Sequence, residues 1–154
     1  MSTEIFQIKV DLDSLHLVEG RAGPRVEGVV FAQFSLRPFP SERWVDDPMA
    51  ILAGWLPAAT QLVRGADLTE ELWFLDGPYK IDLARSGSSV EITAVKAKAD
   101  GGEPVASARL EAGAFLDSLV AAGEAVALWA SGHGHRSRDL EMLTAALAEA
   151  TRSL

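Results

Sequence analysis

Residues 39–79 constrain the fold of this chain more than any other segment. They contain three of the four tryptophans and the only tyrosine, together with a dense set of signals that begin and end secondary structure. Asp47 followed by Pro48 predicts a helix start, because aspartate caps free N–H groups and proline at the first helical position sacrifices no hydrogen bond. Apolar residues at helical spacing continue as far as Gly65, so we expect a helix over residues 48–64 that ends at this glycine.

Two segments before this helix are expected to be strands. Residues 5–12 and residues 26–36 alternate apolar and polar side chains with a period of two, which is typical of half-buried strands. The segment 19–25 between them contains the glycines and the proline of a loop. We therefore expect one strand on each side of this loop.

Local signals after the helix predict a second group of strands. Asp76-Gly77 lies between two apolar runs and predicts a two-residue hairpin turn. Residues 90–98 and 105–110 predict further strands, and a change of apolar face at Val95 indicates a bulge or a sheet edge.

The C-terminal third is expected to be helical. Apolar residues at helical spacing run from Phe115 to Ala127, and a second amphipathic helix follows, capped by Ser137 or Asp139. The element order is ββαββββαα, and tight turns between the strands imply antiparallel pairing. We predict a single α+β domain over residues 1–154, in which one antiparallel sheet of five or six strands has helices packed on one face.

Composition is typical of an ordered protein in a reducing compartment. The chain has 154 residues, of which 48% are hydrophobic, and this is enough for one core. It has no cysteine, which excludes disulfides, thiolate nucleophiles and zinc–sulfur sites. No signal peptide or membrane span is expected, because the most apolar stretch, residues 49–63, is shorter than the roughly 20 residues that a bilayer requires. We expect a cytoplasmic bacterial protein.

The charge balance narrows the class of partner. Fourteen basic and 22 acidic residues give a net charge of -8. A negative surface repels phosphate backbones, so nucleic-acid binding is not expected. The same charge suits a basic protein partner, and it also serves solubility.

A pair of histidines is the one feature that suggests a metal site. His133 and His135 are two residues apart, which allows two imidazoles to share a metal, and Asp139 follows four residues later. Nothing marks the remaining ligands, and the neighbouring glycines are also typical of a flexible connection between helices. No cofactor or metal is expected, and a small metal-dependent enzyme that uses these three residues is kept as an alternative.

An aromatic and acidic cluster precedes the first predicted helix. Asp46 and Asp47 could perform acid–base chemistry if their pKa values differed, but helix capping and the helix dipole already explain both carboxylates. Trp44 is explained by packing over the helix start. Asp76 and Tyr79 belong to a hairpin tip, and exposed loops on a rigid sheet carry much binding. Apart from the capping residue, these are the candidate interaction residues, and no catalytic residue is assigned.

One segment also supports a resemblance. The order F-P-x-x-x-W-x-D, a helix with an internal tryptophan, and L-x-F-x-D-G-P-Y is carried here by Phe39, Pro40, Trp44, Asp46, Trp55, Leu72, Phe74 and Asp76 to Tyr79. It resembles an order found in small uncharacterised bacterial proteins, some of which are grouped as immunity proteins of toxin systems. The likeness covers about forty residues of turn and cap signals. It implies a single-domain cytosolic binder and carries over no catalytic residue.

The leading hypothesis is a non-enzymatic binding protein, in the form of an immunity-type partner of a basic toxin domain. The chain has neither a G-x-S-x-G nucleophile motif nor a phosphate-binding loop. A self-associating interaction module is a further alternative, because six phenylalanines and four tryptophans can form an exposed apolar patch. Trp44 is the residue that this alternative selects.

Overall fold

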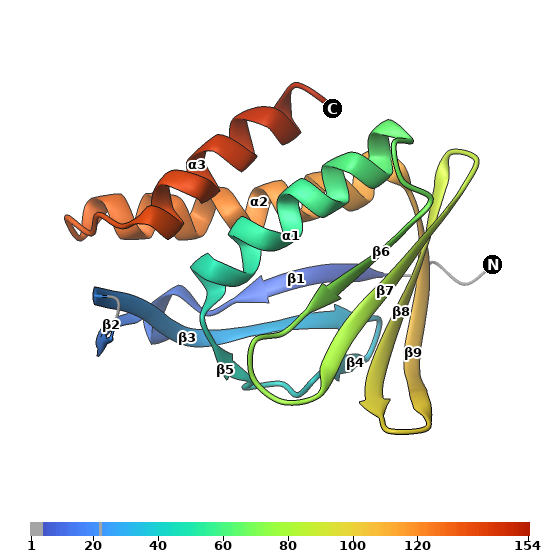
Figure 1. Ribbon diagram of the computed structural model, residues 1–154, viewed down its shortest axis with the longest axis horizontal. Coiled ribbons are helices and arrows are strands. Elements are labelled where there is room, and N and C mark those ends of the chain that lie inside the picture. The colour runs from blue at the N-terminus through green and yellow to red at the C-terminus, as the bar shows by residue number, and fades with distance from the viewer. Residues whose placement is uncertain (1–4, 22) are drawn as a thin grey trace.

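The computed structural model describes residues 5–21 and 23–154. It has an α+β fold with three helices and two antiparallel sheets, one of five strands and one of four. The helices lie on one side of the first sheet, and the second sheet stands at one end of the molecule (Figure 1). The predicted fold class is therefore confirmed, whereas the predicted single sheet is wrong.

The first sheet is built around one long strand, β3. Its strands are β1 (Phe6–Val10), β2 (His16–Gly20), β3 (Gly23–Phe34), β4 (Arg37–Phe39) and β5 (Val45–Asp46), with a short 3-10 helix η1 (Leu12–Ser14) between the first two. Strand β3 pairs antiparallel with each of the other four. Ala32 pairs with Ile8 on one side and with Phe39 on the other, so both edges of β3 are occupied there. The later strands pair with one another in a separate sheet.

The second sheet is a meander of consecutive strands. It runs in the order β6 (Thr69–Trp73), β7 (Tyr79–Ser86), β8 (Ser89–Lys98) and β9 (Gly101–Glu111). The pairing register shifts between Ala94 and Val95, which agrees with the bulge and not with the sheet edge, the two alternatives predicted there. Side chains on one face of these strands point into the core, and the other face lies toward solvent.

Short strands lie in segments for which the sequence predicts a loop or no element. Residues 19–25 are predicted to be a loop, but β2 continues to Gly20 and β3 begins at Gly23, and these two residues pair with each other. The side chains of β2 are mostly exposed, so its sequence lacks the alternation that marks a half-buried strand. Strands of two or three residues, such as β4 and β5, are too short to show any period.

The three helices begin and end at local signals. Helix α1 (Pro48–Arg64) is capped by Asp47, whose side chain accepts a hydrogen bond from the Ala50 N–H, and it ends at Gly65 with φ 81°. This confirms the helix expected over residues 48–64. Helix α2 (Ala112–Gly132) is capped by Glu111, and α3 (Arg138–Thr151) by Ser137, one of the two caps predicted for it.

Helix α2 is apolar enough to cross a membrane by length and composition alone. It has 21 residues, and its most apolar window has a mean hydropathy of 1.3 and is 44% buried within the protein. The core helix of a globular protein has the same length and composition. Here Phe115, Leu116 and Leu119 are fully buried in the hydrophobic core that joins both sheets and all three helices.

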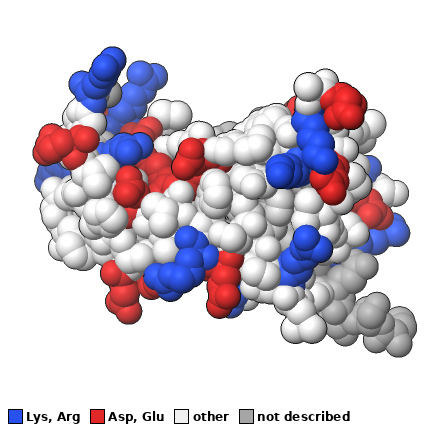
Figure 2. Space-filling model, turned by 90° about the horizontal axis from the view of Figure 1, so that it is seen from below, with Lys and Arg blue, Asp and Glu red and all other residues white. Residues whose placement is uncertain are grey.

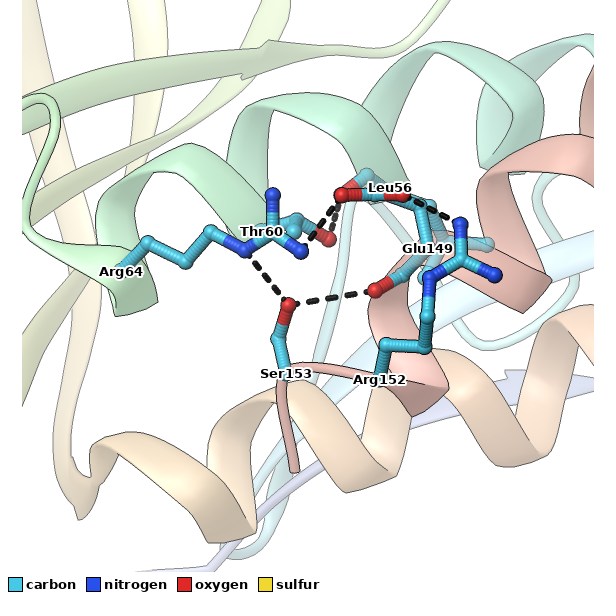
Figure 3. Close-up of polar contacts among 6 residues, drawn as sticks. All are labelled: Leu56, Thr60, Arg64, Glu149, Arg152 and Ser153. Atoms are coloured by element: carbon cyan, nitrogen blue, oxygen red, sulfur yellow. Dashed lines mark hydrogen bonds and ion pairs between the residues drawn. The ribbon is translucent and has the colours of Figure 1, made fainter.

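Polar contacts attach the end of α3 to the end of α1 (Figure 3). The Arg64 Nε donates to the Ser153 Oγ at 2.7 Å, and the Arg64 guanidinium pairs with Glu149 at 2.5 Å. Arg152 pairs with the same carboxylate, and the hydrogen bonds from Arg152 and Arg64 lower the pKa of Glu149. These groups are well exposed, so the contacts orient α3 more than they stabilise it.

Candidate binding surface

The Asp46 carboxylate connects three segments where the two sheets approach each other. Its Oδ2 accepts hydrogen bonds from the Trp44 Nε1 and from the Asp76 N–H, both at 3.1 Å. Its Oδ1 accepts the Asp47 N–H at 2.8 Å. Asp46 is only 8% exposed, so these bonds replace the water that the carboxylate loses on burial. The carboxylate therefore holds the loop after β6 against the start of α1.

Aromatic rings fill the interior behind this carboxylate. The Trp44 ring meets the Tyr79 ring edge-on at a centroid distance of 5.2 Å, and Tyr79 in turn meets Phe39 at 5.6 Å. Phe74 packs edge-on against Trp55 at 5.0 Å, and the Trp55 Nε1 donates to the Trp73 carbonyl at 2.8 Å. Each edge-to-face pair of this kind contributes about 0.5–1.5 kcal/mol beyond the burial of its area.

The structure thus brings together the four candidate interaction residues. Trp44 and Tyr79 are in ring contact, and Asp46 bonds both Trp44 and the backbone of Asp76. Trp44 and Tyr79 are half-buried and Asp46 is buried, so only Asp76 is exposed. Most of these side chains therefore lie beneath the protein surface and hold it in place, and only Asp76 forms part of the surface itself.

Two exposed apolar residues and a cavity form the surface above this support. Val45 is 46% exposed and Leu75 is 62% exposed. Both line a cavity of about 350 Å³, together with Arg25, Val26, Glu27, Asp46, Asp47 and Asp76. Four carboxylates and one guanidinium therefore surround the cavity, which we call the acidic cavity. A signal for Leu75 was present in the sequence: Leu72 and Phe74 face the core, so the alternate residue Leu75 must face outward.

The predicted two-residue hairpin at Asp76-Gly77 is longer than expected. Strand β6 ends at Trp73 and β7 begins at Tyr79, so residues 74–78 form the connection. The turn chemistry is correct, because Gly77 has φ 68°, a value that favours glycine. Within this longer loop the Asp76 N–H bonds the Asp46 carboxylate, 30 residues earlier in the chain.

Asp47 combines helix capping with an unfavourable electrostatic position. Burial raises the pKa of Asp47, and the nearby charges of Asp139 and Asp46 raise it further. The hydrogen bond from Ala50 and the charge of Arg25 act in the opposite direction. The ionised form is therefore less favourable in the folded protein than in the unfolded chain.

This position makes the stability of the protein depend on pH. The folded pKa of Asp47 lies above its ordinary value of 3.8, so the stabilising contribution is complete below that pH and is lost as the pH rises through the folded pKa. Asparagine retains the cap without the charge. We expect Asp47→Asn to unfold at an equal or higher urea concentration than the wild type at pH 7, with the difference vanishing below about pH 4.

Asp47→Ala provides the control for this measurement. It removes the charge and the cap together, and loss of an N-cap costs about 1 kcal/mol. A lower unfolding midpoint for Asp47→Asn than for the wild type at pH 7 would contradict the electrostatic account.

The two histidines of the metal alternative point to different partners. The His133 ring is exposed, stacks on the Trp129 ring at a centroid distance of 4.3 Å, and its Nδ1 bonds the Trp129 carbonyl at 2.8 Å. The His135 ring is 4% exposed, and its Nε2 bonds the Ser137 Oγ at 3.0 Å. Within residues 5–21 and 23–154, no three His, Asp or Glu side chains gather in a way that could hold a metal ion. Asp139 is thus not combined with this pair.

Charges of both signs are spread over the lower face of the molecule. Figure 2 shows basic and acidic side chains interspersed on this face, with uncharged surface between them. The net charge of -8 is therefore not collected into one continuous acidic field on this side.

Comparison with known protein families, with curated proteins and with solved structures found no match to this chain. The fold defines the class as an α+β protein with two antiparallel sheets and three helices. Because one fold can carry many unrelated sites, function has to be inferred from the surface around the acidic cavity.

Proposed function

We propose that this chain is a non-enzymatic binding protein that recognises a basic protein partner. The observation that carries the proposal is the acidic cavity with Val45 and Leu75 exposed beside it. Apolar side chains at the centre of a contact with charged groups around them are typical of protein interfaces. An immunity-type partner of a basic toxin domain is the form of this function that the sequence resemblance supports.

Rigidity of the surface also supports binding. The loop that carries Leu75 is attached through Asp76 to the Asp46 carboxylate, and the rings of Trp44 and Tyr79 pack beneath it. A surface held in place in the free protein loses little conformational freedom when a partner binds. In this proposal the candidate interaction residues predicted from the sequence hold the binding surface in place from beneath.

Self-association is a weaker proposal on two grounds. Two copies that met at this surface would bring eight carboxylates and two guanidinium groups together, and like charges oppose such a contact. The phenylalanine count does not support an exposed patch either. Five of the six phenylalanines are buried: Phe6, Phe34, Phe39, Phe74 and Phe115.

Co-purification from the native host tests the proposal. A tagged chain is expected to retain a stoichiometric partner of basic isoelectric point, identified by mass spectrometry. Isothermal titration with the purified partner should then show Leu75→Ser binding about tenfold more weakly than the wild type, because burial of a leucine contributes about one to three kcal/mol. Binding should also weaken as the salt concentration rises.

Leu36→Ser is the matched control. Leu36 is 98% exposed in the turn between β3 and β4 and does not line the acidic cavity. Its replacement is expected to leave the partner's affinity unchanged. Absence of any stoichiometric partner, or equal affinity losses for the two variants, would overturn the proposal.

A further inference from the structure

Strand β1 forms an edge of the first sheet. On its inner side, the Ser35 N–H donates to the Ile5 carbonyl at 2.8 Å. Consecutive residues of a strand direct their backbone groups to opposite sides, so the groups of three later residues face the outer side: Phe6, Ile8 and Val10. Within residues 5–21 and 23–154, no strand pairs with this outer side. Unpaired backbone groups at a sheet edge are a template for a further strand.

A groove runs between this outer side of β1 and helix α2, which lies above β1 in Figure 1. The groove has a volume of about 510 Å³, and residues 5–10 form most of its strand wall. Its helix wall consists mostly of small side chains: Ala114, Asp117, Ser118, Ala121, Ala122 and Ala125. The Ser118 Oγ accepts the Ile8 N–H at 3.4 Å. Among the described residues, the N–H groups of Phe6 and Val10 have no such partner and remain open to the groove.

We infer that this groove receives an extended segment of another protein, which adds to the first sheet as a strand beside β1. The outward N–H groups and carbonyls of β1 recur at every second residue, and an extended backbone presents donors and acceptors at the same spacing. A helical segment offers no such row, because its backbone groups are already bonded to one another. The groove shares no lining residue with the acidic cavity, so this inference stands apart from the proposed function.

The charges beside the groove define the chemistry of this segment. Lys9 is exposed on the side of β1 that faces away from the core, whereas Asp117 is exposed on the helix wall. In a pair of strands, side chains directly opposite each other lie on the same face of the sheet. The residue opposite Lys9 therefore points away from the helix, and an acidic side chain complements it. The residues on either side of it point toward α2, where apolar side chains fill the groove and a basic side chain complements Asp117.

A second copy of this chain would fill the groove less well. Its β1 would direct Phe6 and Ile8 toward the helices, but both side chains are already buried in the core of that copy. The space beside the small residues of α2 would then stay empty, and voids in an interface forfeit contacts. A segment of another protein whose side chains are free satisfies both the backbone groups and the groove.

A short peptide tests the groove without the natural partner. The probe is the acetylated and amidated peptide Val-Thr-Val-Glu-Lys-Thr-Val, whose glutamate can lie opposite Lys9 with its lysine toward Asp117. Hydrogen exchange followed by nuclear magnetic resonance is expected to show the Phe6 and Val10 amides slowed at least about threefold by the peptide, because both gain a hydrogen bond. The same peptide with N-methyl groups on its third and fifth residues keeps the side chains but lacks the N–H groups that would face β1. It should leave both amides unchanged. Equal protection by the two peptides, or no protection by the probe at millimolar concentration, would overturn the inference.

Variants of the groove locate the binding. Ala121→Arg places a long side chain in the groove from an exposed position of α2 and should weaken the probe at least about tenfold. Leu128→Arg adds the same charge at an exposed position of α2 outside the groove and should leave binding unchanged. Lys9→Glu should weaken the probe, and a peptide with lysine in place of its glutamate should recover the loss. Equal effects of the two arginine variants would contradict binding in the groove. A dimer in light scattering that Ala121→Arg alone dissociates would assign the groove to a second copy instead.

Discussion

Replacement of Asp46 by alanine is expected to lower the free energy of unfolding by about 3 kcal/mol. The Asp46 carboxylate accepts hydrogen bonds from the Trp44 Nε1, the Asp76 N–H and the Asp47 N–H. Alanine leaves all three donors without a partner at a position that is 8% exposed. Each buried donor without a partner costs about 1–3 kcal/mol, and water that enters the new space recovers part of this loss.

Urea unfolding followed by tryptophan fluorescence measures this effect, with Asp76→Ala as the control. Asp76 contributes only its backbone N–H to the carboxylate, and its own side chain is exposed, so its replacement should change stability by less than about 0.5 kcal/mol. Amide exchange of residues 74–77 should also accelerate in Asp46→Ala, because the loop is no longer attached. Equal stability of the two variants would show that Asp46 does not hold these segments together.

Helix α1 could be predicted to the residue because its signals are local. Asp47 and Pro48 mark its start, and Gly65 with φ 81° marks its end. Each signal acts within one turn of the chain, where neighbouring residues decide the backbone conformation. The bulge after Ala94 was predictable for the same reason. The apolar residues of this one strand change from one face to the other at Val95, and the sequence shows that change directly.

The division into two sheets could not be predicted, because it depends on contacts between distant segments. For β6 to pair with the long strand β3, β3 would need a free edge. That edge is closed by β4 and β5, which have three and two residues and show no period of their own. The number of strands in a sheet is therefore a property of the packed structure and not of any single segment.

The candidate interaction residues can be predicted from local sequence signals, but the contacts that bring them together link distant segments. The sequence marks Trp44, Asp46, Asp76 and Tyr79 by local cap, turn and aromatic signals. In the structure the Asp46 carboxylate bonds Trp44 and, 30 residues away, Asp76, and Tyr79 contacts the Trp44 ring. The alternation of Leu72 and Phe74 indicates that Leu75 faces away from them, but the sequence does not show that this face stays uncovered, because exposure of an apolar side chain depends on which face the rest of the protein covers.

Gly77→Val is expected to lower the free energy of unfolding by about 3 kcal/mol, for two separable reasons. Gly77 has φ 68°, which a β-branched residue adopts only with strain, and a Cβ there would lie 2.9 Å from the Tyr79 ring and 3.1 Å from the Trp44 ring. Gly87 has a similar φ of 61°, and a Cβ there would have no other atom within 4 Å, so Gly87→Val carries the strain without the clash. Urea unfolding should therefore place Gly87→Val between the wild type and Gly77→Val, at a loss of about 1–2 kcal/mol. Equal losses in the two variants would show that the rings of Trp44 and Tyr79 yield freely, and a rigid surface beside the acidic cavity would then be excluded.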